Sequence, residues 1–240
     1  DNVVQTNSVV LAADTAVNAL VFRSYSLEVS GDHTLRLNSG AFLTAQNTRT
    51  QKITCSRLDF AGREAFITVH NTGGYSTPLT ISSVITNAAG LTFAGTKSTD
   101  TLSSSLNLSG ATVYTGRTAI LVGTLQVQGG DNRLPVDTWV SIGYGARFSL
   151  NNVSQTVSGI EGFGTISIGS ASRALIVNNA SDFVYEGAVT GAGRLHKLGA
   201  GTQTLTGACT YSGTTTVSNG TLRLDGSLAP AAGAVTVYPD

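Results

Sequence analysis

Short apolar or alternating runs recur along the chain at intervals of about ten residues, which is the spacing of strands separated by turns. Between these runs stand glycine-containing breaks such as Gly73-Gly74 and Gly129-Gly130. No window of twelve residues keeps the apolar spacing of an amphipathic helix without such a break. We therefore predict an all-β chain with essentially no helix. The predicted strand segments are 17–22, 34–37, 65–69, 79–85, 118–122, 138–142, 146–150, 174–177 and 221–224.

One long motif occurs at least twice. Residues 108–127 (LSGATVYTGRTAILVGTLQV) align with residues 205–224 (LTGACTYSGTTTVSNGTLRL) at a constant offset, and residues 84–95 resemble residues 188–199 less closely. We place the two repeat copies at about 81–127 and 188–224. Tandem strand-turn units with little between them favour a solenoid.

The composition also favours a solenoid. The chain has 33 Thr, 25 Ser, 28 Gly and 14 Asn, together 100 of 240 residues. In a parallel β-helix, Thr, Val, Ser and Asn stack in ladders while Gly turns the corners. The rival fold, one or two antiparallel sandwiches, requires hairpin signals, of which only Asn219-Gly220 qualifies. We therefore predict a right-handed parallel β-helix that forms a single domain over residues 1–240.

The C-terminal third resembles the autotransporter-associated β-strand repeat, whose pattern runs G-x-G-x-L-x-K-x-G-x-G-T-x-T-L-x-G-x-N-T-Y-x-G-x-T-x-V-x-x-G-T-L. The stretch 191–224 matches this pattern at most positions, with Cys209 where the family has Asn. The matching residues are Gly191, Gly193, Leu195, Lys197, Gly199, Gly201, Thr202, Thr204, Leu205, Gly207, Thr210, Tyr211, Gly213, Thr215, Val217, Gly220, Thr221 and Leu222.

This resemblance implies a passenger-type β-helix from a cell-surface or secreted protein of a Gram-negative bacterium. Such passengers are usually followed by an outer-membrane barrel, and no barrel segments are expected after residue 190. The last residues, GAVTVYPD, read as the start of another coil, so we expect an open end that can stack. No stretch approaches the length of a transmembrane helix, and the N-terminus has no signal-peptide pattern. We therefore expect no membrane insertion by this segment and any export signal to have been removed.

The two cysteines, Cys55 and Cys209, leave three alternatives open. They are 154 positions apart in the sequence, so at about 25 residues per coil they would lie roughly 30 Å apart along one straight solenoid, too far for a disulfide. Two buried free thiols are the favoured interpretation. An intermolecular disulfide between successive subunits and an intramolecular bond in a folded-back chain are the alternatives.

Candidate chemistry is sparse. Equal numbers of acidic and basic residues, 14 each, argue against a polybasic nucleic-acid binder. The three His are scattered, so no metal site or cofactor is expected. Two carboxylate pairs, Asp59 with Glu64 and Asp182 with Glu186, are more simply interpreted as solvated charges.

Four further side chains have structural interpretations. Trp139, within the strand TWVSI, is assigned to the core. Arg194, His196 and Lys197 are interpreted as outward residues around inward Leu195 and Leu198.

These observations predict a non-enzymatic structural or adhesive β-helix. It would be either a passenger stalk of a surface protein or the subunit of an extracellular filament. Its expected partners are further coils, copies of itself, or host and matrix glycans or proteins. The alternative is a polysaccharide-binding or polysaccharide-degrading module, which a row of aromatics and acids on consecutive coils would favour.

Overall fold

The computed structural model describes residues 1–24, 26–45, 50–70, 78–98, 102–228 and 233–238. These residues contain strands and turns and no helix. They divide into two compact units, residues 1–126 and 127–240. Neighbouring strands in the sheets of both units are parallel, apart from one small hairpin, so the chain is the predicted all-β parallel solenoid.

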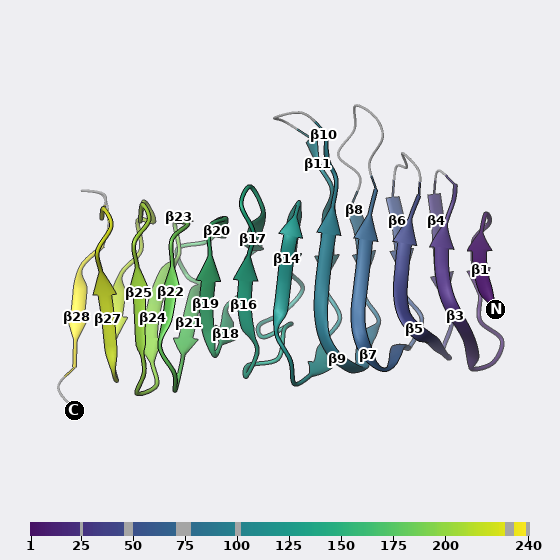
Figure 1. The fold of residues 1–240 in the computed structure, drawn as a ribbon, viewed down its shortest axis with the longest axis horizontal. Coiled ribbons are helices and arrows are strands. Elements are labelled where there is room, and N and C mark those ends of the chain that lie inside the picture. The colour runs from purple at the N-terminus through teal and green to yellow at the C-terminus, as the bar shows by residue number, and fades with distance from the viewer. Residues whose placement is uncertain (25, 46–49, 71–77, 99–101, 229–232, 239–240) are drawn as a thin grey trace. The chain divides into compact units, whose positions relative to one another are not determined.

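In the first unit each coil contributes one strand to each of two sheets, and successive coils stack along both sheets (Figure 1). The first sheet runs β1 (Asn2–Gln5), β3 (Thr15–Phe22), β5 (Thr34–Thr44), β7 (Arg57–Val69) and β9 (Val84–Gly95), with β13 (Thr112–Tyr114) and β14 (Thr118–Val122) both beside β9. The second runs β2 (Val9–Val10), β4 (Ser26–Ser30), β6 (Thr50–Ile53), β8 (Pro78–Ile81), β12 (Ser105–Leu108) and β15 (Thr124–Val127). A short antiparallel pair, β10 (Lys97–Ser98) and β11 (Leu102–Ser103), interrupts the fifth coil, between β9 and β12.

The second unit has three strands in most coils (Figure 1). One sheet runs β16 (Trp139–Ile142), β19 (Gly159–Gly162), β22 (Phe183–Tyr185), β25 (Thr202–Leu205) and β27 (Thr221–Leu224). Another runs β17 (Arg147–Leu150), β20 (Thr165–Ile168) and β23 (Ala188–Gly191). The third runs β18 (Gln155–Val157), β21 (Ala174–Asn178), β24 (Arg194–Leu198), β26 (Thr215–Val217) and β28 (Val235–Val237).

The core of each unit is a set of columns formed by inward side chains of successive coils. Phe148, Ile166 and Val189 are register partners and are fully buried. Alternation of inward apolar and outward polar side chains along each strand produces these columns, because successive strand residues point to opposite faces. Asn219-Gly220, the one hairpin signal in the sequence, connects β26 and β27, which belong to different sheets. It therefore turns a coil corner instead of closing a hairpin.

Candidate functional site

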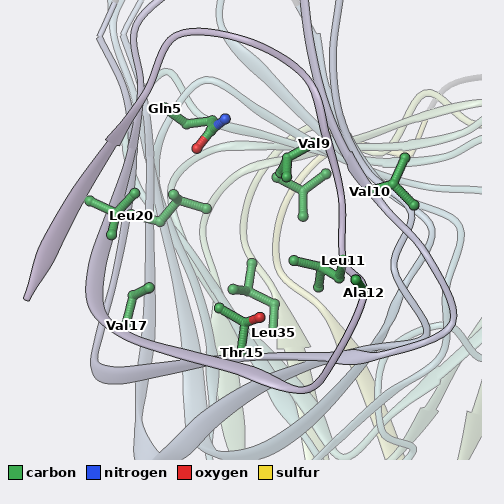
Figure 2. Close-up of a pocket in the computed structure, with 11 residues that line it drawn as sticks. Gln5, Val9, Val10, Leu11, Ala12, Thr15, Val17, Leu20 and Leu35 are labelled. Carbon is green, nitrogen blue, oxygen red and sulfur yellow. The ribbon is translucent and has the colours of Figure 1, made fainter.

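The first coil leaves a hollow at its open side. The hollow has a volume of about 280 Å³ and is lined mainly by aliphatic side chains. Figure 2 shows Val9 and Leu11 of the first coil grouped with Leu20 of β3 and Leu35 of β5, which belong to the next two coils. Val9 is only half-buried, although its register partner Val29 in the next coil is buried. An inward apolar side chain therefore reaches solvent at this end, beside β1 at the edge of its sheet.

The described residues of the last coil show the same feature. Val235 and Val237 of β28 pair in register with Thr215 and Val217, which are both buried. Val235 and Val237 are 49% and 66% exposed at these equivalent inward positions. Both end coils thus present side chains that a further stacked coil would bury.

The two repeat copies share a buried hydrogen bond. The hydroxyls of Tyr114 and Thr118 are 2.5 Å apart in the first copy, and those of Tyr211 and Thr215 are 2.6 Å apart in the second. All four side chains are buried. The shared spacing Tyr-x-Gly-x-Thr therefore encodes one repeated local structure.

A close approach between coils explains the glycine within this motif. A Cβ at Gly116 would lie 2.1 Å from the Ala89 carbonyl oxygen, and one at Gly213 would lie 2.2 Å from that of Gly193. Any larger residue at either position would collide with the backbone of the preceding coil.

The other leucines and glycines of the predicted repeat motif, with Tyr211, occupy inward or turn positions. Leu195, Leu205 and Tyr211 are buried, and Leu222 in the last coil is partly exposed. The remaining glycines of the motif lie at or beside coil corners, Gly191, Gly193, Gly199, Gly201, Gly207 and Gly220.

Lys197 corrects the sequence analysis, which placed it outward. Its side chain is fully buried, sharing the inward face of β24 with Leu195, whereas Leu198 lies on the opposite face and is partly exposed. The ammonium Nζ donates to the carbonyl oxygens of Leu198 (2.5 Å), Gly199 (2.7 Å) and Asn219 (3.2 Å). Burial lowers the pKa of this ammonium below its ordinary value of 10.5, and the nearby carboxylate of Asp182 opposes the shift.

The outward assignment failed because a lysine was assumed to seek solvent. Three converging carbonyl oxygens replace the water that the ammonium loses, and this satisfies its three donors inside the coil. The contact to Asn219 also joins two successive coils.

Both cysteines are free and buried, and they belong to different units. Cys55 is 1% exposed with Sγ 3.4 Å from the Ser83 hydroxyl, and Cys209 is 2% exposed. Burial raises the pKa of both thiols above the ordinary value of 9.0. Neither thiol is therefore readily ionised, and the intermolecular disulfide through Cys55 and Cys209 stays a prediction.

The candidate carboxylates have local hydrogen-bond partners. Asp59 accepts hydrogen bonds from the Ala61 amide and the Asn87 side chain, and it lies 4.0 Å from an Arg36 guanidinium nitrogen of the adjacent coil. Glu64 accepts a hydrogen bond from the Thr92 hydroxyl at 2.7 Å. In the second pair, Asp182 accepts the Thr202 amide at 2.7 Å. These contacts favour the interpretation of both pairs as structural charges.

Within the described residues no three His, Cys, Asp or Glu side chains are grouped to hold a metal ion. The same residues include no helix long and apolar enough to cross a membrane.

The sequence analysis missed two exposed aromatic side chains. Tyr144 is 89% exposed and Phe163 is 59% exposed, each in a turn that follows a strand of the same sheet. Each is flanked by glycines, in Gly-Tyr-Gly at 143–145 and Gly-Phe-Gly at 162–164. That repeated tripeptide is the signal that could have identified them. Trp139 is likewise only partly buried and lies on the outer face of β16, opposite the inward Val140 and Ile142, so its assignment to the core was wrong.

Stacked parallel coils with a repeated Tyr-x-Gly-x-Thr core define a parallel β-solenoid built from a repeated unit. In agreement, residues 103–127 and 195–224 match the passenger-associated transport repeat family. The chain is also 35% identical over 217 residues to the adhesin BmaC autotransporter of Brucella suis biovar 1 (strain 1330). That alignment covers 88% of this chain and 6% of the adhesin, so the chain spans a small part of the length of this relative. No solved structure matched the chain.

The matches overlap both ranges in which repeat copies were predicted, and they confirm the resemblance that the motif carried. The chain therefore carries two segments that match passenger-associated transport repeats and is similar to an autotransporter adhesin over most of its length. Its division into domains and the hand of its coil stay predictions.

Proposed function

We propose that this chain is an adhesive and structural segment of a passenger exposed on the surface of a Gram-negative bacterium. The observation that carries the proposal is the repeated passenger motif, with one buried geometry in both copies. The similarity to an autotransporter adhesin supports the adhesive part. Secretion or surface display is the matching location, and no catalytic role is proposed.

The mechanism is mechanical support. Parallel hydrogen-bond ladders join each coil to the next, and buried apolar columns fill each unit. Each coil is therefore held by its neighbours, and its turns present side chains at fixed intervals. A rigid support of this kind can present contact residues without a conformational change.

Surface display tests the proposal. The 240-residue chain is fused to an autotransporter translocator in a non-adherent Gram-negative strain, and bound bacteria are counted on epithelial cell layers. The matched control is the same translocator carrying a non-adhesive passenger of equal length. We expect protease-accessible chain on the cell surface and more bound bacteria than in the control. Equal binding at equal surface density would contradict the adhesive function.

A second candidate function is end-to-end stacking into an extracellular filament. It is supported by the hollow of the first coil and by exposed Val235 and Val237 at inward positions of β28. Because the thiols are buried, stacking through these ends would not depend on a disulfide between Cys55 and Cys209.

Light scattering of the purified chain with and without reductant tests this candidate. Stacking by the end coils predicts concentration-dependent polymers that reductant does not change. Polymers that disappear on reduction would support the interchain disulfide instead, and a monomer of 24.6 kDa at all concentrations would reject the filament.

A further inference from the structure

A row of turn residues in the second unit lies at one corner of the coils, between the sheet of β16 and the sheet of β17. The amides of Phe163, Glu186, Thr206 and Asp225 each donate to the preceding coil, with lengths of 2.8 to 2.9 Å. Tyr144 lies in the equivalent turn after β16, and a Cβ at Gly164 would lie 2.5 Å from the carbonyl oxygen of Ala146 in that turn. The five turns therefore stack. We name this row the corner ridge, and its members are Tyr144, Phe163, Glu186, Thr206 and Asp225.

The two aromatic rings of the corner ridge are unusual for a surface. Tyr144 has the largest exposed fraction among the exposed large hydrophobic side chains of the described residues. No group within 4 Å would meet a Cβ at the adjacent Gly145, so the surroundings of this turn are open. Fold stability gains little from rings that are 89% exposed at Tyr144 and 59% exposed at Phe163, so contact with a partner is the better explanation for both rings in consecutive coils.

The polar part of the corner ridge gives the chemistry of the partner. Glu186 and Asp225 provide carboxylate acceptors, and Thr206 provides a hydroxyl. Glu161, two positions before Phe163, adds a carboxylate beside the aromatic pair on the outer face of β19. These acceptors suit a ligand that brings many hydroxyl donors, and their negative charge disfavours sulfate or phosphate groups.

The regular spacing of the corner ridge favours a ligand that is itself built from repeated units. Phe163, Glu186, Thr206 and Asp225 each follow a register partner of the preceding coil, so they place one side chain per coil at about 4.8 Å intervals. Tyr144 lies in the turn before them, one residue beyond Gly143, which is the position equivalent to Phe163. A linear polymer of similar units can lie along such a row and place one kind of contact against several coils. A pyranose has a face of C–H groups that packs on an aromatic ring and a rim of hydroxyls that donate to carboxylates.

We propose that the corner ridge binds a neutral, linear glycan, with Tyr144 and Phe163 stacking on sugar rings and Glu186 and Asp225 accepting hydroxyl hydrogen bonds. Asp225 also accepts the Arg223 guanidinium at 2.8 Å, which fixes its orientation. The exposed Arg147, at the start of β17, can donate to a sugar oxygen near Tyr144. This inference rests on the proposed adhesive function and gives it a ligand class.

Titration of the 240-residue chain with cellohexaose, chitohexaose and heparin tests the inference, by calorimetry and by amide chemical shifts in NMR spectra. We expect saturable binding of at least one neutral hexasaccharide, with shifts confined to the corner ridge, and weaker or no binding of heparin. The double variant Tyr144→Ala/Phe163→Ala should lose at least about tenfold in affinity. Tyr144→Phe should retain binding because the ring remains.

Phe66→Ala is the matched control, because Phe66 is an exposed aromatic at 44% in the first unit. It should bind as the parent chain does, and all variants should keep the far-ultraviolet circular dichroism of the parent. Absence of saturable binding to both neutral hexasaccharides would overturn the inference, as would full affinity in the double variant or preferential binding of heparin.

Displayed on cells, the same double variant separates the two proposals. Undiminished adhesion of the variant would overturn the glycan site and leave the adhesive function standing. Absence of adhesion by the parent chain would remove the adhesive function, even if the purified chain binds a hexasaccharide.

Discussion

Lys197 shows how a single residue connects coils. Its ammonium contacts carbonyls of its own turn and of Asn219 in the next coil, at the centre of the C-terminal repeat copy. The matched family pattern places a lysine at this position, two residues after the inward Leu195, yet it was interpreted as outward from the sequence. The sequence could not predict the three carbonyl oxygens that compensate for burying this charge, because the positions of these oxygens depend on the backbone conformation of the corner turns.

Substitution of Lys197 by methionine should lower the free energy of unfolding by about 2 to 4 kcal/mol, because three carbonyl oxygens lose a charged donor. Urea unfolding monitored by circular dichroism measures the change. Arg194→Met on the same strand is the control, since Arg194 is exposed and should cost less than about 0.5 kcal/mol. Equal effects of the two variants would contradict the role assigned to Lys197.

Buried acids that must stay neutral predict sensitivity to alkaline pH. Burial raises the pKa of Cys55, Cys209, Tyr185 and Tyr211 in the folded chain. Above the ordinary thiol pKa of 9.0 the unfolded chain therefore releases protons before the folded chain does. The free energy of unfolding should then fall as pH rises from about 8.5 to 11. The lowered pKa of Lys197 instead raises the free energy of unfolding as pH approaches 10.5. Because this one group acts against the four buried acids, the free energy of unfolding should still fall.

Urea titrations at pH 7, 9 and 10.5 measure this dependence. The Cys55→Ser/Cys209→Ser variant should lose the part of the decline near pH 9 and keep the part above pH 10. Stability that stays constant or rises over the whole interval would show that these groups are not buried as described.

At the scale of the elements, the sequence was sufficient where alternation and glycine breaks determine the structure. Segments such as 146–150 and 174–177 lie in β17 and β21 as expected, whereas 79–85 spans the break between β8 and β9. Alternation with the inward Val140 and Ile142 places Trp139 on the outer face of β16, so its assignment to the core did not follow this pattern. Alternation could not predict which residues form the corner ridge, because the lengths of the turns determine which residues stack at a corner.

The Tyr-x-Gly-x-Thr unit occurs in both repeat copies, so its contribution to the free energy of unfolding can be measured at two sites of one molecule. Tyr114→Phe and Tyr211→Phe should each lower the free energy of unfolding by about 1 kcal/mol, because each removes one buried hydrogen bond between the tyrosine and threonine hydroxyls. The two effects should add in the double variant, because the tyrosines belong to separate units. Thermal unfolding of the three variants, with exposed Tyr144→Phe as the control, checks this. A neutral effect at one of the two sites would indicate that the copies are not structurally equivalent.

At the scale of the whole molecule, every proposal depends on coils that stack in parallel and in register. The corner ridge needs consecutive turns at one corner, and stacking at the ends needs β1 and β28 to offer unpaired edges. The passenger-type repeat supports this organisation from sequence, and the columns of buried side chains support it from structure. An antiparallel arrangement of the same strands would place neither the corner-ridge residues in one row nor the buried side chains in columns.

The most direct test is the register of the coils, measured as nuclear Overhauser contacts in the isotope-labelled 240-residue chain. The account predicts side-chain contacts from Phe148 to Ile166 and from Ile166 to Val189, with parallel backbone contacts between β17, β20 and β23. Antiparallel contacts across Asn219-Gly220, between β26 and β27, together with absence of the Phe148–Ile166–Val189 column, would contradict the solenoid and the functions proposed from it.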